Sequence, residues 1–131
     1  MVVIVCLDQK NGMKFNHRRQ SMDRTIISDI YDMLLDSPLA MSENSQSLFK
    51  SYEGVIEIEE NPDLDTMFYF LESSAMDDLL VDEIVVYRFD KVYPADEYFP
   101  IDLKKYVLMD VSEFAGYSHD KISKEVYSRI I

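Results

Sequence analysis

Residues 82–130 read DEIVVYRFDKVYPADEYFPIDLKKYVLMDVSEFAGYSHDKISKEVYSRI. The apolar run Ile84 to Phe89 has the length and β-branched content of a buried strand. An acidic turn ending at Phe99-Pro100 leads, through an Ile-Asp-Leu segment, to a strand that closes with Ser112-Glu113-Phe114. A polar loop with His119 then precedes a last strand, Glu125 to Ile130. This order predicts a buried strand followed by an antiparallel pair of strands.

Strand and helix patterns alternate in the chain before residue 82. Val2 to Leu7 is nearly all apolar, which predicts a strand buried on both faces. After the polar loop His17 to Gln20, either Ser21 or Asp23 can cap a helix. The remaining predicted elements are the apolar helix positions Ile26, Ile27, Ile30, Met33 and Leu34, a strand Pro38–Met41, a helix after Ser42 with Leu48, Phe49 and Tyr52, a half-exposed strand Val55–Ile58, a central strand Thr66–Leu71, and a short helix over Ala75, Met76, Leu79 and Leu80. The pattern predicts a three-layer α/β domain with a mixed, mainly parallel central sheet.

Length and composition limit the class of protein. A chain of 131 residues is expected to form a single domain, residues 1–131, and 47% hydrophobic residues can supply a core. No apolar run approaches the roughly 20 residues that cross a bilayer. The chain start lacks the basic region of a signal peptide. One cysteine, Cys6, allows no intrachain disulfide, so we expect a reducing, cytoplasmic location.

The chain is strongly acidic, with a net charge of −12. Such a surface repels nucleic acids and anionic membranes, and neither is an expected partner. It favours solubility and, where partners exist, basic ones.

Glycine is scarce, and its positions exclude the common nucleotide-binding loops. The three glycines are Gly12, Gly54 and Gly116. Both the G-x-G-x-x-G and the G-x-x-x-x-G-K-S/T motifs need glycines only a few residues apart, so that backbone amides can approach a phosphate. Neither motif can occur in this chain.

The order of elements, above all in residues 82–130, resembles the dihydrofolate reductase fold, and the start VVIVCLDQKNGMKFN resembles the family's first strand and substrate-side loop. The resemblance covers most of the chain, with shortened loops. The segment CLDQKNGMKFNHRRQSMDR also looks like small bacterial proteins that carry an automatic "ribonuclease Z" label. That label implies a metal site.

The first residue that the resemblance marks is Asp23. In dihydrofolate reductases a carboxylate at the start of the first helix binds the pteridine and supports its protonation, and Asp23 stands at the matching place. A buried carboxylate there is expected to have a raised pKa and to serve as a catalytic acid. The alternative is that Asp23 only stabilises the helix N-terminus.

The resemblance also implies an NADPH site, and here the chain departs from the family. The family has a Gly-Gly pair after the central strand, where this chain has Phe70-Leu71-Glu72-Ser73-Ser74. It has a Gly-Arg-Lys/His-Thr element after the second strand, where this chain has Ser42-Glu43-Asn44-Ser45. Side-chain bulk and a carboxylate replace the groups that would hold the phosphates, so we expect no cofactor.

A basic cluster near the first helix is the main candidate ligand site. It comprises His17, Arg18 and Arg19, with Arg24 nearby, and Met13 and Phe15 are expected to line the same pocket. Paired guanidinium groups can hold a carboxylate, a phosphate or an acidic peptide. The alternative is that these cations neutralise acids such as Asp8, Asp29 and Asp32.

Metal and nucleophilic chemistry have no clear signature. Only two histidines exist, His17 and His119, and no H-x-H-x-D-H or H-E-x-x-H motif occurs, so no metal site is expected. Cys6 lies in an apolar strand, where a thiol stays protonated. Ser118 and His119 are adjacent in a loop, which does not make a catalytic dyad.

The sequence therefore predicts a pseudoenzyme: a non-catalytic dihydrofolate reductase-like binding or interaction protein. Its partner would be a small anionic ligand or another protein, and both a monomer and a homodimer remain open. The first alternative is a residual reductase-like enzyme that uses Asp23 as an acid on a small heterocycle. The second is a nucleic-acid hydrolase, which the acidic charge and the missing metal motif disfavour.

Overall fold

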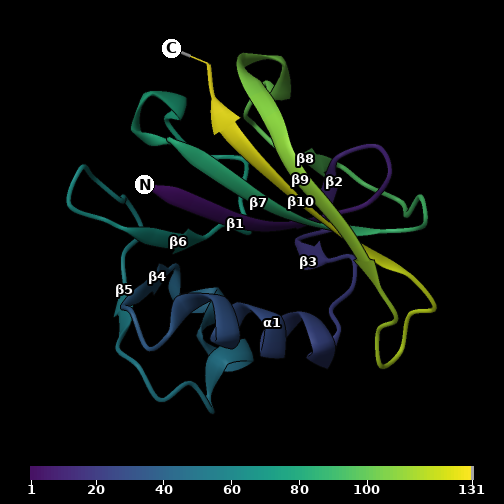
Figure 1. The fold of residues 1–131 in the computed structure, drawn as a ribbon, viewed down its shortest axis with the longest axis horizontal. Helices are drawn as coiled ribbons and strands as arrows, with labels where there is room; N and C mark the ends of the chain where they lie inside the picture. Colours follow the sequence, from purple (N-terminus) through teal and green to yellow (C-terminus); the bar gives the residue numbers. More distant parts are fainter. Residues whose placement is uncertain (131) are drawn as a thin grey trace.

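The computed structural model describes residues 1–130 and is built around a seven-stranded sheet with the order β5-β4-β6-β1-β7-β10-β9 (Figure 1). The strands are β1 (Val2–Leu7), β4 (Leu39–Met41), β5 (Ile56–Ile58), β6 (Phe68–Phe70), β7 (Glu83–Phe89), β9 (Tyr106–Phe114) and β10 (Ile122–Arg129). All pairings from β5 to β7 are parallel, whereas β10 runs antiparallel to both β7 and β9. The predicted mixed, mainly parallel sheet with an antiparallel C-terminal pair is confirmed.

The two faces of this sheet are covered differently. The helix α1 (Arg24–Leu34) packs below the sheet in Figure 1 and buries Ile26, Ile30 and Leu34 against it. The opposite face is covered by loop segments that contribute Val81 and Ile101. Alternate residues of β1 enter the two cores, as expected for a central strand with both faces covered.

The helices after α1 are shorter and tighter than predicted. The helix expected after Ser42 is a 3-10 helix, η1 (Glu43–Phe49), and Ser42 makes no capping hydrogen bond. The helix expected over residues 75–80 is reduced to η2 (Asp78–Leu80), which is capped by Asp77. Leu79, expected on its apolar face, is 79% exposed. A third 3-10 turn, η3 (Leu103–Lys105), precedes β9.

A small second sheet was not predicted. It has the order β3-β2-β8, with β2 (Gly12–Phe15), β3 (Arg18–Arg19) and β8 (Glu97–Tyr98). Asn16 and His17 have φ values of 52° and 64° and form a tight turn between β2 and β3. A two-residue hairpin turn with both φ values positive matches the twist of the strands it joins. The expected polar loop His17 to Gln20 is therefore wrong in part, because Arg18 and Arg19 pair as a strand.

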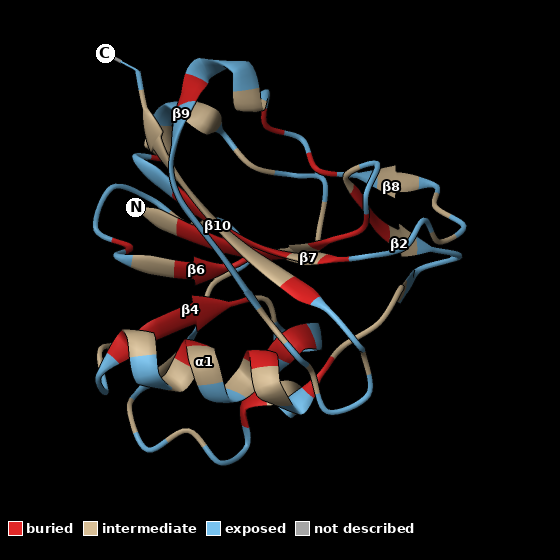
Figure 2. Ribbon diagram, turned by 45° about the vertical axis from the view of Figure 1, so that its right-hand side comes forward, coloured by how far each residue is buried: buried red, intermediate tan, exposed pale blue. Residues whose placement is uncertain are grey.

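Burial falls sharply toward the C-terminal edge of the large sheet. Figure 2 shows β4, β6 and β7 with buried segments, while β9 is exposed along most of its length. None of the helices within residues 1–130 has the length and apolar character needed to span a membrane.

Candidate functional site

The carboxyl ends of β1, β4 and β6 meet at one side of the large sheet. In open parallel sheets, ligands bind outside these ends, where the strand order changes direction. The segments that follow the strands here begin with Asp8, Ser42 and Leu71 respectively. These three segments surround the position at which the resemblance would place the phosphates of a cofactor.

Three side chains bridge this position. Arg19, on β3, donates to Glu72 from Nε to Oε2 at 2.7 Å and from Nη2 to Oε1 at 2.9 Å. Ser45, on η1, donates its hydroxyl to Glu72 Oε1 at 2.6 Å. Ser45 is fully buried, and only 11% of the Glu72 side chain is exposed. We call these residues the Arg19–Glu72–Ser45 clamp; the forked ion pair is the strong, bidentate type.

The clamp determines the direction of the Glu72 side chain. Its carboxylate faces Arg19 and Ser45, and only 11% of the side chain is exposed to solvent. A phosphate at this position would meet the Glu72 charge, while the Arg19 cation beside it is already neutralised. The residues present therefore do not fit the phosphates of a dinucleotide.

Little room remains beneath the clamp. A cavity of about 10 Å³ is bounded by Arg19 and Glu72 of the clamp and by apolar groups that include Cys6, Leu71 and Phe89. That volume holds about one water molecule. Met13, expected in the ligand pocket, lines this cavity and is 5% exposed. Burial, together with the nearby Glu72 charge, raises the pKa of the Cys6 thiol, as expected for an unreactive cysteine.

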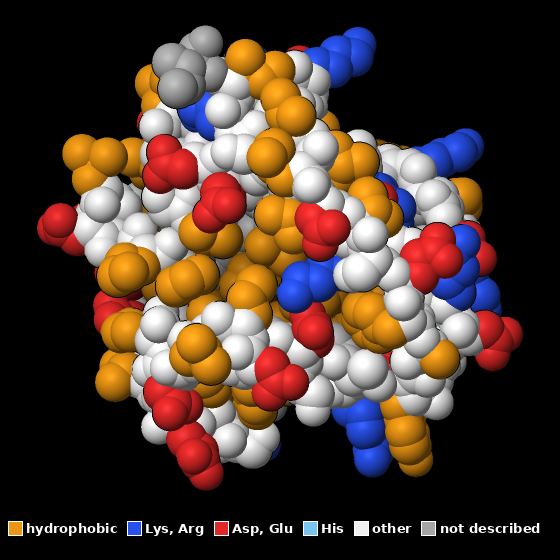
Figure 3. All heavy atoms as spheres, viewed as in Figure 1, with side chains coloured by type: hydrophobic (Ala, Val, Ile, Leu, Met, Phe, Trp, Pro, Cys, Tyr) orange, Lys and Arg blue, Asp and Glu red, His pale blue; other side chains and the backbone are white. Residues whose placement is uncertain are grey.

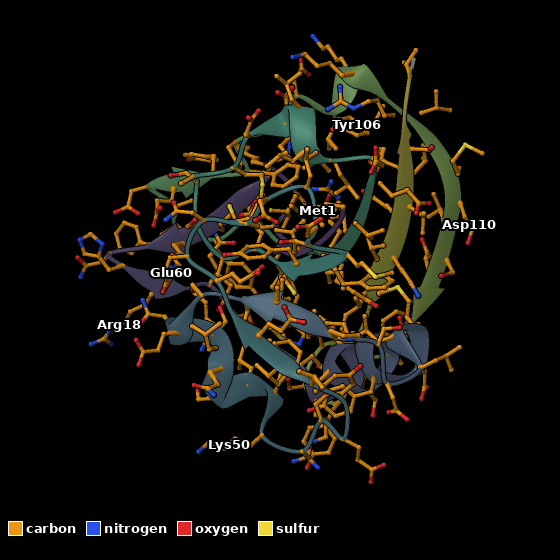
Figure 4. The ribbon with its side chains drawn as sticks, turned by 90° about the vertical axis from the view of Figure 1, so that its left-hand side faces the viewer. Met1, Arg18, Lys50, Glu60, Tyr106 and Asp110 are labelled. Atoms are coloured by element: carbon orange, nitrogen blue, oxygen red, sulfur yellow. The ribbon has the colours of Figure 1, made fainter. Side chains whose placement is uncertain are left out.

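A larger, open groove lies outside the clamp. Its volume is about 440 Å³, and its lining comprises Lys14, His17, Arg18, Arg19, Asn44 and Glu72. A second hollow of about 250 Å³, lined by Phe15, Arg18, Arg19, Gln20, Tyr93 and Pro94, lies on the other side of Arg18. In Figure 4 the labelled Arg18 projects away from the protein at the edge of the molecule. We call the 440 Å³ space the cationic groove.

The groove is unusual on an acidic chain. Figure 3 shows acidic side chains scattered among hydrophobic and neutral ones on the face it draws, with basic side chains in separate groups. In the groove, Lys14, His17 and Arg18 come from one short hairpin. Arg24, expected in the same site, lines neither hollow; its guanidinium lies 3.8 Å from the centre of the Tyr117 ring.

The expected pairing of the basic cluster with Asp8, Asp29 and Asp32 does not occur for Arg19, which pairs with Glu72. Asp29 instead accepts from Lys124 Nζ at 2.8 Å. The buried Asp8 accepts from the amides of Lys10, Gly12 and Tyr93 and from Gln20 Nε2. Burial opposes ionisation of Asp8, yet these donors together lower its pKa. Asp8 thus joins the turn between β1 and β2 to Tyr93 and Gln20, a role that the sequence pattern did not reveal.

Asp23 is the N-cap of α1 and lies beneath the loop between β9 and β10. Its Oδ1 accepts from the amides of Thr25 and Tyr117, both at 2.9 Å. Its Oδ2 accepts from the Ser118 amide at 2.9 Å and from His119 Nδ1 at 2.8 Å. A Cβ at Gly116 would lie 2.5 Å from Oδ2, so only glycine permits this close approach.

The pKa of Asp23 moves in the direction opposite to the one expected. Burial alone would raise it, but the hydrogen bonds from His119, Tyr117, Ser118 and Thr25 hold the pKa of the carboxyl well below its ordinary value. The charged form is therefore favoured. Both oxygens are occupied by protein donors, so this geometry favours the anchoring alternative over the proton-donor hypothesis.

His119 extends this contact to a further residue. Its Nε2 lies 2.8 Å from the Ser21 hydroxyl, and its ring stacks on Phe89 with centroids 4.8 Å apart. Sequence reasoning treated His119 as an ordinary loop residue and missed Ser21, which lies 98 positions away in the chain. No spacing rule could have joined them.

Within residues 1–130, no group of three or more His, Cys, Asp or Glu side chains is arranged to hold a metal ion.

Replacing Asp23 with asparagine should destabilise the protein in a pH-dependent way. An asparagine cannot accept from all of these donors, and leaving buried partners unpaired should cost about 3 kcal/mol at pH 7. The folded pKa of Asp23 lies below the unfolded value near 3.9, so the stabilisation is complete above that pH and is lost as pH falls. Urea denaturation of both proteins between pH 7 and pH 3 should show the gap narrowing below about pH 4.

Asp120→Asn is the matched control, because Asp120 is an exposed carboxylate in the same loop. Its free energy of unfolding should follow that of the unmodified protein. A constant gap for Asp23→Asn across the whole pH range would contradict the assigned ionisation of Asp23.

Comparison with known proteins bears on the fold alone. No protein family model matches the sequence, and no curated protein sequence matches it. Among solved structures, the chain is similar to dihydrofolate reductase from Enterococcus faecalis, complexed with NADP(H) and RAB-propyl, with a TM-score of 0.72 and 11% sequence identity. The alignment covers 99% of this chain and 96% of that one. The chain therefore has a dihydrofolate reductase-like fold.

Proposed function

We propose that this protein is a binding protein on a dihydrofolate reductase-like scaffold, and not a dinucleotide-dependent reductase. The observation that carries the proposal is the Glu72 carboxylate, held by Arg19 at 2.7 Å and by Ser45 at 2.6 Å. It lies where the resemblance would place a phosphate. The segment after β4 is the second place where the resemblance would put phosphate-binding groups. Here it forms η1, which contributes Ser45 to the clamp and contains no lysine or arginine.

The ligand class follows from the cationic groove. Lys14 and Arg18 have no ion-pair partner within residues 1–130, so their charges are free to meet an anion. Asn44 adds a neutral hydrogen-bonding side chain to the same lining. We infer a ligand that carries a phosphate or carboxylate group, on a small molecule or at an acidic protein segment.

The reductase alternative, with Asp23 as acid, gains no support from the site. Asp23 faces Tyr117, Ser118 and His119, and its pKa is lowered. A substrate would have to displace this loop before it could reach the carboxyl group.

NADPH should leave the melting temperature unchanged in the variant with Lys14→Ala and Arg18→Ala, in which the cationic groove cannot hold its phosphates. A ligand that binds only the native state must stabilise it: at about 1 mM, a Kd of about 10 µM would add about 2.7 kcal/mol. Differential scanning fluorimetry with and without NADPH measures this, with the Enterococcus faecalis dihydrofolate reductase as a positive control. A rise of several degrees for this variant would show a dinucleotide site outside the cationic groove and would overturn the proposal.

Small anions should bind in the cationic groove. Titration calorimetry with inorganic pyrophosphate at low salt should detect binding, and Lys14→Ala with Arg18→Ala should weaken it at least about tenfold, a loss of about 1.4 kcal/mol. Binding should also weaken as salt is added, since the groove is exposed.

Lys50→Ala is the control for loss of a positive charge outside the groove. Lys50 is exposed and lies well away from Arg18 in Figure 4. Equal weakening by Lys50→Ala, or unchanged affinity in the groove variant, would place the anion site elsewhere.

A further inference from the structure

Three side chains from separate parts of the chain form a hydrogen-bonded series next to the clamp. Ser21 Oγ lies 2.8 Å from His119 Nε2, and His119 Nδ1 lies 2.8 Å from Asp23 Oδ2. Ser21 precedes α1, Asp23 caps it, and His119 comes from the loop between β9 and β10. We call this series the Ser21–His119–Asp23 relay.

The hydrogen-bond partners determine the direction of proton donation. Asp23 is ionised and can only accept, so His119 must carry a proton on Nδ1. In the neutral imidazole, Nε2 is then an acceptor and receives the Ser21 hydroxyl proton. This is the order in which a hydroxyl nucleophile, a general base and an orienting carboxylate act in serine hydrolases.

The relay is held in place by its surroundings. The Asp23 side chain is fully buried, and only 11% of the His119 side chain is exposed. Phe89 packs on the imidazole ring with an interplanar angle of 30°. The amides of Tyr117 and Ser118 fix the carboxylate that fixes the ring. A catalytic group needs this kind of support from neighbouring packing and hydrogen bonds.

Ser21 also borders a cavity that Arg19 lines together with its ion-pair partner Glu72. This cavity is the space of about 10 Å³ under the clamp. Arg19 donates to Glu72 from Nε and Nη2. The other N–H groups of its guanidinium can donate to an oxyanion. The cationic groove shares Arg19 and Glu72 with this cavity, so the two spaces lie on either side of the same ion pair.

We propose that Ser21 is a nucleophile that accepts an acyl group from a small ester. The cavity of about 10 Å³ is too small for an acyl group, so the ester would reach Ser21 from the side on which this residue is partly exposed. Ser21 Oγ attacks the ester carbonyl carbon while its proton passes to His119 Nε2. The carbonyl electron pair forms an oxyanion beside Arg19, then re-forms the carbonyl as the ester C–O bond breaks.

The remaining steps balance the reaction. The leaving alkoxide takes the proton from His119 and departs as the alcohol, which leaves acyl-Ser21. Water then attacks the acyl carbon, gives its proton to His119, and releases the carboxylic acid as Ser21 regains its proton. This inference goes beyond the proposed binding function and does not depend on it, because Lys14 and Arg18 take no part in the relay.

The test uses the intact protein and p-nitrophenyl acetate. We expect a burst of p-nitrophenolate of up to one equivalent per protein, and a single added acetyl group on the peptide that contains Ser21. Ser21→Ala should abolish both signals. His119→Gln should slow acetylation at least about 100-fold, the contribution of a general base.

Ser47→Ala is the control, since Ser47 is an exposed serine on η1. It should acetylate at the unmodified rate. Circular dichroism of each variant separates loss of reactivity from loss of fold, and peptide mapping of the unmodified protein decides the question without any variant. Acetyl groups found only on lysines or the N-terminus, or a burst that survives Ser21→Ala, would overturn the proposal.

Discussion

The need to pair the largely buried carboxylate of Glu72 is the constraint on which the arrangement of the Arg19–Glu72–Ser45 clamp and its surroundings depends. A largely buried charge must be paired and hydrogen-bonded, because an unpaired one costs several kcal/mol. Glu72 meets that requirement with Arg19 from β3 and Ser45 from η1. The same contacts draw the small sheet, the first 3-10 helix and the end of β6 together. What would be an open cleft in the sheet therefore becomes a small cavity beneath an ion pair.

A second buried carboxylate organises the neighbouring region. Asp23 ties the start of α1 to the loop between the last two strands, 94–96 positions further along the chain. Gly116 allows that loop to approach. The two carboxylates have separate roles: Glu72 is held in the Arg19–Glu72–Ser45 clamp, while Asp23 supports His119, which contacts Ser21. The cationic groove on the β2–β3 hairpin remains open to solvent beside Glu72.

Much of the fold could be predicted because its strands are short apolar runs with clear boundaries. The strands β1 and β7 and the amphipathic α1 were found in this way, and the antiparallel C-terminal pair followed from the order of segments. The 3-10 helices η1 and η2 were not, since periodicity does not separate a tight turn from a full helix. The β2–β3 hairpin was missed because Asn16-His17 lacks the glycine usual at its turn.

The site could be predicted only in part, because its contacts join residues that lie far apart in the chain. The residues that stand where the resemblance would place a glycine pair and cations, Glu72 among them, could be read from the sequence directly. The partner of Arg19 could not, because it lies 53 positions away and tertiary packing alone brings it near. Burial of Asp23 suggested a raised pKa, yet four neighbouring residues donate hydrogen bonds that lower it. Such effects depend on loop conformations that local sequence does not encode.

The most direct test of this account is a double-mutant cycle on Arg19→Gln and Glu72→Gln. If the ion pair holds the cleft closed, the free energies of unfolding of the two single variants and the double variant should reveal a coupling of about 1–2 kcal/mol. The coupling should persist at moderate salt, since the Glu72 side chain is only 11% exposed. Additive effects, within about 0.3 kcal/mol, would mean that the two charges do not depend on each other and would contradict the central claim.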